Sequence, residues 1–506
     1  MPQSTLDPHA TPSREAVVSR WIVPGLVALT PAVLLVHGYH PFSDDASIYV
    51  AGIRKLVDPA LYKPDAAFVL ANTRLSLFAH AIAATIRVSR VPLTVVLLAT
   101  HLASIFLFLL AGWSVASRLF SRAWEQWSAV AFAAACFTLP VAGTALVVMD
   151  PYVTARSFST PLGLFAVAAA LDRRWGLATL FLALMGLMHP LMVVYAAALI
   201  VFYATFDTGH PRVAILLGLA EVGLAGMIWL ATRHEAVSHA FYEAMHSRGR
   251  TFLFLAQWKW YEDLGLVLPL ALLGLTAYRA RAGRVCRLCL ACIVLGVCST
   301  VAAILFVHVS GPYLLVRVQL LRSFHIIYAL GVLLLGGWLG SVLGYRRRTR
   351  WILPVLLAMA GGGLFLAQRA TYPHSRHIEW PGARPHNLWV QAYGWINGNT
   401  PADAYFAADP NLQFRDGVDT QGFRAIAERS LLADDKDQGI AALDPPLAGE
   451  WAAQRDAHVG LETMTDTERI RRLQPFGVTW LLLSAGSPTN FPCPYRNAVA
   501  KVCRMD

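Results

Sequence analysis

Apolar segments long enough to cross a lipid bilayer recur along most of this 506-residue chain. A membrane-spanning helix needs about 20 consecutive, mostly apolar residues. Inside lipid, only helices and closed barrels satisfy their own backbone hydrogen bonds. Composition agrees, because 56% of the residues are hydrophobic and only 14% are charged, whereas soluble domains carry about 25% charged residues. We therefore predict a mainly α, polytopic transmembrane helical bundle.

The hydrophobic pattern predicts about eleven spans. The first, WIVPGLVALTPAVLLVH, follows the polar segment 1–20 and lacks a small-residue cleavage pattern, so we interpret it as a retained signal anchor. A short apolar segment at 74–86 is flanked by arginine, which favours an interfacial helix over a span. The ten later spans are expected at 91–116, 124–147, 157–171, 176–189, 190–206, 213–232, 264–279, 288–308, 323–343 and 351–368.

Arginines cluster in alternate loops of this layout and indicate its orientation. Loops on the cytoplasmic side are enriched in Lys and Arg, so the N-terminal segment 1–20 and these loops are predicted to be cytoplasmic. We expect a multi-pass protein of the inner (plasma) membrane. The basic loop residues are Arg118, Arg122, Arg173, Arg174, Arg212, Arg279, Arg281, Arg284, Arg287, Arg346, Arg347, Arg348 and Arg350.

The formal charge of +11 is concentrated in the membrane half, while the tail is near neutral. This distribution fits a topological use of charge, and no basic stripe with interleaved aromatic residues indicates nucleic-acid binding. The chain contains no Walker A motif, no Gly-rich dinucleotide loop and no G-x-S-x-G element. ATP-driven transport and α/β-hydrolase chemistry are therefore unsupported.

The layout divides the chain into a cytoplasmic segment, a transmembrane domain over 21–368 and an extracytoplasmic tail over 369–506. The first outer loop, 38–90, is the longest. In the tail, DAYFAAD (403–409) and GVTWLLLSA (477–485) are typical of buried strands bounded by turn residues, and helical patterns lie between them. We predict a small α/β domain in which Cys493 and Cys503 close a hairpin disulfide in an oxidising compartment.

The stretch PFSDDASIY, residues 41–49, places Asp44 and Asp45 where the first outer loop begins. A carboxylate at a membrane surface can take the proton from an acceptor hydroxyl as a general base. Two adjacent carboxylates also raise one another's pKa and can hold a cation. The alternative is structural, because Ser and Asp before ASIYVAGIRKL also fit a helix N-terminus. Both uses are compatible if one Asp caps the helix and the other faces a cleft.

MDPYVTARSFSTPL, residues 149–162, brings a second acidic residue to the outer surface. Asp150 is a candidate member of a carboxylate or metal site with the first loop, and Arg156 is a candidate phosphate ligand through forked hydrogen bonds. The alternative is an Asp150–Arg156 pair that only anchors a helix end, which contributes little at a surface.

Other cationic or ionisable residues lie near the outer ends of spans. His189, before Pro190 in GLMHPLM, is a candidate substrate contact where the helix breaks, although a lone histidine is more often structural. Arg317, Arg322 and His325 in GPYLLVRVQLLRSFH sit where the positive-inside rule does not call for cations. They are expected to bind an anion, either a lipid headgroup or a substrate phosphate.

Taken together, these features resemble the GT-C class of membrane glycosyltransferases. The runs DPYVTARSFSTPLGLFAVAAAL, MGLMHPL and WINGNTPADAYFAADP, and the acidic and Arg-containing stretch GFRAIAERSLLADDKD (422–437), are similar to bacterial GT-C-type proteins. The resemblance implies many spans, a first outer loop with a catalytic acidic residue, and a C-terminal outer domain. It implies that Asp44 or Asp45 is the catalytic base and that Asp150 belongs to a further acidic motif.

The expected activity is the transfer of a sugar from a polyprenyl-phosphate carrier to an extracytoplasmic glycan, lipid or protein acceptor. A divalent cation such as Mg or Mn is an optional cofactor, and membrane lipid is an expected partner. The alternative is a non-enzymatic, lipid-handling transporter or an inactive GT-C-like scaffold. Convergence of the carboxylates in one cleft with Arg156 and Arg322 favours transfer, whereas a polar cavity through the membrane favours transport.

Overall fold

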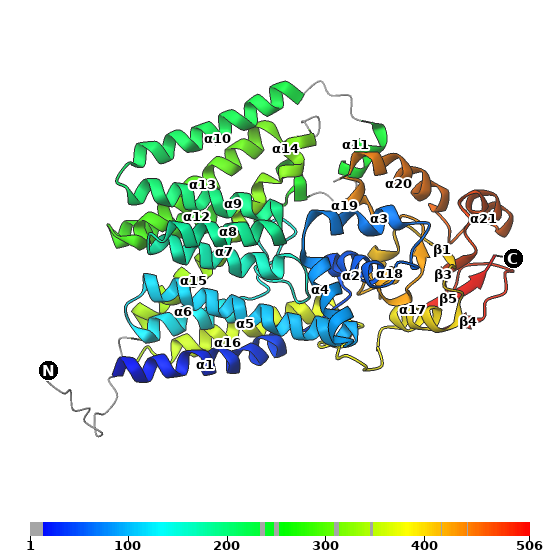
Figure 1. Ribbon diagram of the computed structural model, residues 1–506, viewed down its shortest axis with the longest axis horizontal. Coiled ribbons are helices and arrows are strands. Elements are labelled where there is room, and N and C mark those ends of the chain that lie inside the picture. The colour runs from blue at the N-terminus through cyan, green and yellow to red at the C-terminus, as the bar shows by residue number, and fades with distance from the viewer. Residues whose placement is uncertain are drawn as a thin grey trace.

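The computed structural model describes residues 14–232, 238–246, 252–307, 313–344, 348–415, 417–442 and 444–505. Long helices run side by side in a bundle, and the C-terminal residues form a separate body at one end of it (Figure 1). The bundle helices are α1 (Arg14–His37), α5 (Leu93–Leu119), α6 (Ala123–Ala135), α7 (Arg156–Leu171), α8 (Trp175–Met188), α9 (Pro190–Asp207), α10 (Pro211–Thr232), α12 (Trp260–Ala280), α13 (Arg284–Phe306), α14 (Tyr313–Val318), α15 (Phe324–Leu343) and α16 (Ile352–Thr371).

Seven helical segments within the described residues are long and apolar enough to cross a membrane, which makes the chain a multi-pass membrane protein. The apolar parts of α1, α7 and α8 are shorter than that length. The expected count of eleven spans is therefore not confirmed. The segment expected to be interfacial forms α4 (Phe78–Ser89), which is bent by 102° from the helical residues 66–75 before it. If this bent pair is one broken span, the number of spans rises to eight.

The span expected over 124–147 is wrong in its second half, because α6 ends at Ala135. Pro140 has no N–H group to continue a helical hydrogen-bond ladder. The chain instead folds back on itself, and the Val141 amide donates to the Leu146 carbonyl oxygen at 2.8 Å. The Met149 amide donates to the Phe137 carbonyl oxygen at 2.8 Å. This buried turn satisfies its own backbone and delivers Asp150 to the end of the bundle.

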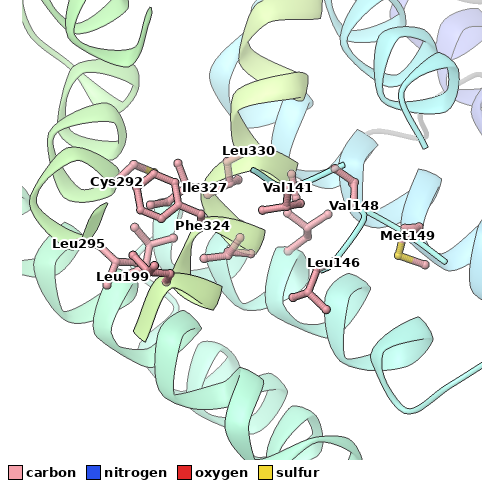
Figure 2. Close-up of a cluster of buried hydrophobic side chains, with 14 of the residues drawn as sticks. Val141, Leu146, Val148, Met149, Leu199, Cys292, Leu295, Phe324, Ile327 and Leu330 are labelled. Carbon is pink, nitrogen blue, oxygen red and sulfur yellow. The ribbon is translucent and has the colours of Figure 1, made fainter. Parts of the chain in front are cut away.

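The turn is packed into the bundle core. Val141, Leu146, Val148 and Met149 belong to the same buried apolar cluster as side chains of three helices, and Figure 2 draws them together. Those side chains are Leu199 of α9, Cys292 and Leu295 of α13, and Phe324, Ile327 and Leu330 of α15. Close packing of buried apolar side chains makes the position of a segment costly to change. The turn therefore holds the residues that follow it, beginning with Asp150, in a fixed position.

The first loop forms α2 (Asp44–Val57), α3 (Ala66–Ala71) and α4, which lie between the bundle and the tail (Figure 1). The tail is an α/β unit, as predicted. Its strands are β1 (Tyr405–Ala408), β2 (Ser430–Leu431), β3 (Trp480–Ser484), β4 (Tyr495–Arg496) and β5 (Ala500–Arg504), in the order β2-β1-β3-β5-β4. Strand β1 pairs in parallel with β2 and β3, and β5 pairs antiparallel with β3 and β4.

Both faces of this sheet are covered. Alternate residues of β1 enter different apolar clusters: Phe406 packs with α17 (Leu388–Asn399) and α18 (Phe423–Ala427), and Tyr405 packs with residues near α21 (Asp466–Leu473). This alternation follows from the two-residue period of a strand. The other tail helices are α19 (Gln438–Ala441) and α20 (Pro445–His458), and α11 (His239–His246) of the bundle packs against them.

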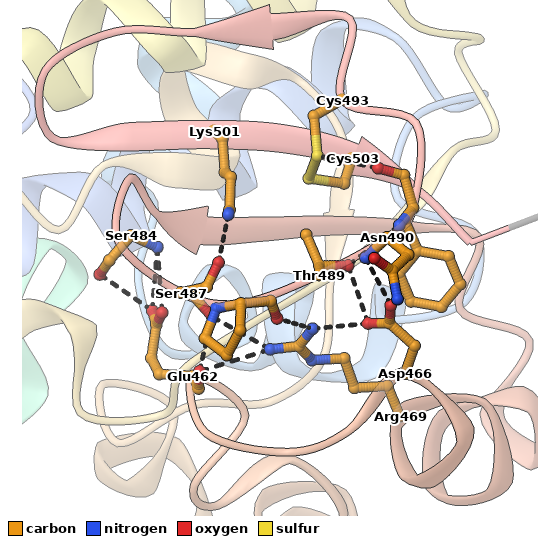
Figure 3. The surroundings of a disulfide bond; sticks show 12 residues. Glu462, Asp466, Arg469, Ser484, Ser487, Thr489, Asn490, Cys493, Lys501 and Cys503 are labelled. Carbon is orange, nitrogen blue, oxygen red and sulfur yellow. Dashed lines mark hydrogen bonds and ion pairs between the residues drawn. A yellow bond between two sulfur atoms is a disulfide. The ribbon is translucent and has the colours of Figure 1, made fainter.

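The predicted disulfide between Cys493 and Cys503 is present. It ties β5 to the residues that precede β4, beside a hydrogen-bond network around the buried Arg469 (Figure 3). The guanidinium of Arg469 contacts the Asp466 carboxylate at 2.7 Å and donates to the Leu461 and Pro488 carbonyl oxygens. The disulfide and this network together stabilise the β5–β4 edge of the sheet in the tail.

Candidate active site

Helix α2 begins at the two adjacent aspartates of the first loop. Ser43 occupies the N-cap position in an extended conformation, but its side chain makes no capping hydrogen bond. Asp44 and Asp45 form the first turn, where negative charge is favoured by the helix dipole. The backbone of Asp44 has a φ of +44°, in the left-handed region that non-glycine residues rarely occupy. Such strain persists only where surrounding contacts hold it in place.

The contacts of Asp44 come from two distant segments. The Tyr152 hydroxyl donates to Asp44 Oδ2 at 3.0 Å. The Lys436 ammonium contacts Asp44 Oδ1 and lies 3.4 Å from Asp45 Oδ1. About half of the Asp44 side chain, 48%, remains exposed. Its carboxylate is therefore held by a bundle residue and a tail residue while staying open on one side.

Arg156, the first residue of α7, joins the other two carboxylates. Its Nη1 lies 2.9 Å from Asp45 Oδ2, and its Nη2 lies 3.1 Å from Asp150 Oδ2. The Thr154 hydroxyl donates to the same Asp150 oxygen at 3.2 Å. Asp150 and Arg156 are both buried, with exposed fractions of 6%. Forked, charge-assisted contacts of this kind fix the geometry of both partners.

Lys436 is positioned by a tight acidic turn in the tail. The Lys436 amide donates to Asp434 Oδ1 at 2.8 Å, and the Asp434 amide donates to Asp437 Oδ2 at 3.1 Å. Asp437 in turn forms an ion pair with Arg424 at 2.8 Å, and Arg424 also pairs with the fully buried Asp65 of the first loop. The turn that presents Lys436 is thus anchored to the first loop by buried charges.

The charges in this cluster have opposite effects on its carboxyl groups. Burial by itself raises the pKa of Asp45, but the nearby charges of Lys436 and Arg156 outweigh it and hold that pKa well below its usual range. Burial raises the pKa of Asp150 above its usual value, against the opposing charge of Arg156. Asp45 therefore stays ionised over the ordinary pH range.

The remaining predicted site residues differ in how close they come to this cluster. The Arg322 charge acts on Asp45, and its guanidinium lies 4.9 Å from the centre of the Phe252 ring. His189 lies within electrostatic range of Arg156, Arg322, Asp45 and His325. Its Nδ1 is buried and has no hydrogen-bond partner among the described residues.

His325 and Arg317 contribute less. His325 is buried, and its Nε2 is 3.1 Å from the Val148 carbonyl oxygen, so it supports the turn before Asp150. Arg317, in α14, forms no ion pair with any residue of the described ranges. Its predicted role in phosphate binding has no support in these contacts.

The cluster does not fit a bound divalent cation. Within the described part of the chain, no three His, Cys, Asp or Glu side chains gather as metal ligands. Asp150 Oδ2 is already shared by Arg156 and Thr154, and Lys436 lies between Asp44 and Asp45. Two cationic side chains occupy the places where a metal would need the same oxygens. The reaction proposed below therefore uses no metal ion.

A polar cleft adjoins the cluster where the first loop meets the tail. Its empty space, open solvent included, is about 400 Å³. Ser47 of α2 lies one turn after the aspartates and lines the cleft together with Lys436 and Gln421. The Gln421 Oε1 atom is buried without a hydrogen-bond partner in the described chain.

Asp44, Asp45, Asp150 and Arg156, predicted as site residues from the sequence, lie together. Tyr152 and Lys436 were not predicted. Tyr152 lies inside the stretch 149–162, and Lys436 lies inside 422–437. The run of acidic residues around a single lysine in that second stretch was the available signal.

No known sequence family matches the chain, and no curated protein matches it in sequence. Solved structures do show similarity. The Archaeoglobus fulgidus oligosaccharyltransferase in complex with Zn and sulfate aligns over 92% of this chain and 68% of its own, at 12% identity and a TM-score of 0.49. The same organism's oligosaccharyltransferase AglB, with an inhibitory peptide and a dolichol-phosphate, aligns over 92% and 70%, at 12% identity and a TM-score of 0.45.

A third structure is the arabinofuranosyltransferase AftD from Mycobacteria. It aligns over 93% of this chain but only 35% of its own, at 12% identity and a TM-score of 0.44. All three are named as transferases in their own right.

Proposed function

We propose that this protein is a membrane glycosyltransferase that moves a sugar from a polyprenyl-phosphate carrier to an acceptor on the side of the membrane where the tail lies. The main support is that charged residues from three separate segments lie together at one end of the bundle. These residues are Asp44, Asp45, Asp150, Arg156 and Lys436. A lipid-linked substrate and a water-soluble acceptor meet only at such a membrane surface. This convergence supports transfer over lipid transport.

In the proposed reaction, an aspartate of the first loop takes the proton from an acceptor hydroxyl. The acceptor oxygen then forms a bond to the anomeric carbon of the sugar, and the bond from that carbon to the carrier phosphate oxygen breaks. The electron pair of the broken bond stays on the phosphate, so negative charge on the leaving group increases. Cationic side chains already fixed beside that oxygen stabilise the transition state.

Asp44 is the better supported base. Its carboxylate is the more exposed of the pair, 48% against 35% for Asp45, and its contacts are a phenol and a single lysine. Asp45 is tied to Arg156, which is itself tied to Asp150. Asp45 and Asp150 then hold Arg156 in position. Arg156 and Arg322, with His189 nearby, are the proposed contacts for the carrier phosphate.

An apolar groove supports a long lipid tail as part of the substrate. It lies between α12 and α15 and has about 1,360 Å³ of empty space, and leucine is its commonest lining residue, with Tyr261 and Arg279 among the polar residues. A polyprenyl chain in a bilayer is already shielded from water, so such a groove would hold it by van der Waals packing. The C-terminal domain, residues 369–506, lies outside the cytoplasm in this proposal, because the arginines of the loops at the other end of the bundle favour the cytoplasmic side.

The test is substitution of the aspartates without a change of size. Asp44→Asn, Asp45→Asn and the double variant are expressed in a strain that lacks the protein, and its envelope glycans are compared by mass spectrometry. Loss of a general base lowers rate by about 10²–10⁴-fold, so we expect the glycan change of the deletion strain to persist in the double variant. Asp58→Asn, at the C-terminal end of α2, is the matched control. Full activity of the double variant would end the assignment of the base.

A further inference from the structure

A second pocket lies where three bundle helices reach the end that carries the tail. Helix α1 ends at His37, α16 ends at Thr371, and α5 begins at Leu93. We call residues 372–387, between α16 and α17 (Leu388–Asn399), the strap. The strap is held to the residues after α1, since the Tyr39 amide donates to the His377 carbonyl oxygen at 2.9 Å and the Glu379 amide donates to the Tyr39 carbonyl oxygen at 3.0 Å. The pocket therefore lies at the end of these helices, where a membrane that the bundle spans would place its lipid headgroups.

We call this space the strap pocket. It has about 840 Å³ of empty space, open solvent included. Its lining includes Tyr39, Thr94, Arg376, Glu379, Trp380 and Arg384. Trp380 is 48% exposed. Tryptophan is enriched at the boundary between lipid and water, where its amphipathic ring is favoured.

The lining has a positive balance of charge. Arg376 and Arg384 form no ion pair with any residue that the structure describes. The Glu379 carboxylate is engaged by His40, at 3.3 Å from its Nδ1. Thr94 lies in the first turn of α5, where the helix dipole also favours a negative ligand. Two arginines and a helix N-terminus together favour a phosphate.

An unpartnered hydroxyl gives independent evidence for a ligand. Tyr39 is fully buried, with an exposed fraction of 0%, and its OH has no hydrogen-bond partner in the described chain. The ring is held by stacking on His101, with the ring centres 5.1 Å apart. A buried polar group left unpaired is unfavourable, and a ligand oxygen that reached the Tyr39 hydroxyl would remove this cost. The Nε atom of Arg376 is also buried without a partner among the described residues.

We propose that the strap pocket binds the phosphate of a lipid headgroup. Arg376 and Arg384 contact the phosphate oxygens, the Tyr39 hydroxyl donates a hydrogen bond, and Trp380 lies at the interface beside the acyl or prenyl chain. The lipid is either a resident phospholipid or a polyprenyl phosphate, which share this chemistry. The inference does not rest on the proposed sugar transfer. Pro41 and Phe42 also line the pocket and stand three and two residues before Asp44, so the bound lipid would stiffen the start of the first loop.

The test is native mass spectrometry of the full-length protein in detergent, titrated separately with phosphatidylglycerol, undecaprenyl phosphate and diacylglycerol. The Arg376→Gln/Arg384→Gln variant is compared with the unchanged protein. Hydrogen bonds to charged groups contribute about 1.5–3 kcal/mol, so we expect roughly a tenfold or greater loss of affinity for a phosphate lipid. Tyr39→Phe should cause a smaller loss, and diacylglycerol should bind equally weakly to all variants.

The matched control is Arg281→Gln/Arg348→Gln, which removes two exposed arginines at the other end of the bundle. Unchanged binding in this control, with loss in the pocket variant, supports the site. A preference for undecaprenyl phosphate over phosphatidylglycerol identifies the substrate carrier as the occupant, and the reverse identifies a resident phospholipid. Equal affinity in both arginine variants, or strong binding of diacylglycerol, overturns the proposal. Binding that persists in Asp44→Asn/Asp45→Asn separates this result from the fate of the proposed reaction.

Discussion

At the scale of single residues, the most informative contact is the one between Lys436 and the two aspartates of α2. A lysine from the tail neutralises part of a three-carboxylate cluster that Arg156 alone does not balance. In this arrangement the ammonium group occupies one side of Asp44, the proposed base. A substrate phosphate arriving at the site offers Lys436 another anion, and the exchange would free Asp44 to accept a proton.

Replacing Lys436 tests this arrangement. Because Lys436 lowers the pKa of Asp45, Lys436→Met should raise that pKa. Protonated Asp45 no longer pairs with Arg156, so the pH at which activity falls on the acid side should move upward. We expect roughly a tenfold loss of kcat/KM for each 1.4 kcal/mol of lost transition-state stabilisation. Lys436→Arg keeps the charge and should keep the acid limb in place. The measurement is a pH–rate profile of sugar transfer, and identical profiles for all three proteins would contradict the role of Lys436.

The sequence allowed part of this site to be predicted. Asp44, Asp45, Asp150 and Arg156 stand near the ends of apolar segments, so their position beside the membrane followed from hydropathy and the positive-inside rule. Lys436 lies more than 390 residues from Asp45, and one lysine in a polar tail has many possible partners. No local pattern specifies which long-range partner such a residue takes, since that depends on how the tail docks.

At the scale of elements, docking of the tail rests on buried ion pairs between α18, the turn at 434–437 and the first loop. Arg424 reaches both Asp65 and Asp437, which are nearly inaccessible to solvent. The Tyr62 hydroxyl adds a hydrogen bond to the Arg424 carbonyl oxygen at 2.7 Å. These contacts set the position of Lys436, so they link the stability of the tail to the geometry of the site.

Removing the charge of Arg424 should therefore be costly. Arg424→Met leaves two buried carboxylates without their partner, a change that typically destabilises a protein by about 3–5 kcal/mol. The purified variant should unfold at a lower temperature by differential scanning fluorimetry. Arg471→Met, an exposed arginine on α21, is the control and should leave the unfolding temperature unchanged. Equal unfolding temperatures for both variants would mean that the docking contacts carry little stability.

The elements were predicted well where periodicity or β-propensity dominated, as in α5, α13, β1 and β3. The prediction was wrong over 136–147, because hydropathy does not distinguish a buried turn from the second half of a span. Pro140 and Gly143 were the local signals for a helix end. Spans shorter than the bilayer, such as α7 and α8, also could not be settled from composition, since their length depends on how the bundle tilts and packs.

At the scale of the whole molecule, the tail, the first loop and the residues after α6 meet at one end of the bundle. Arg281, Arg284, Arg348 and Arg350 lie at the other end, beside α12, α13 and α16. This polarity allows the proposed single site at the end that carries the tail. The disulfide in the tail fits the proposed extracytoplasmic orientation, because such bonds persist in oxidising compartments.

Orientation can be measured with a thiol reagent that does not cross membranes. Asp456→Cys introduces a thiol on α20, where the aspartate side chain is 69% exposed, and it should be labelled in intact cells. Arg281→Cys, at the opposite end of the bundle, should be labelled only after the membrane is permeabilised. The opposite pattern would place the tail in the cytoplasm and exclude an extracytoplasmic acceptor.

The most direct test of the whole account is a cryo-electron microscopy structure of the full chain with a synthetic polyprenyl phosphate bound. We predict density for the phosphate within hydrogen-bond distance of the Arg156 or Arg322 guanidinium, with Lys436 shifted from Asp44 toward it. A phosphate bound at the far end of the bundle, with this cluster unchanged, would contradict the proposal that external charges surround one lipid-linked substrate.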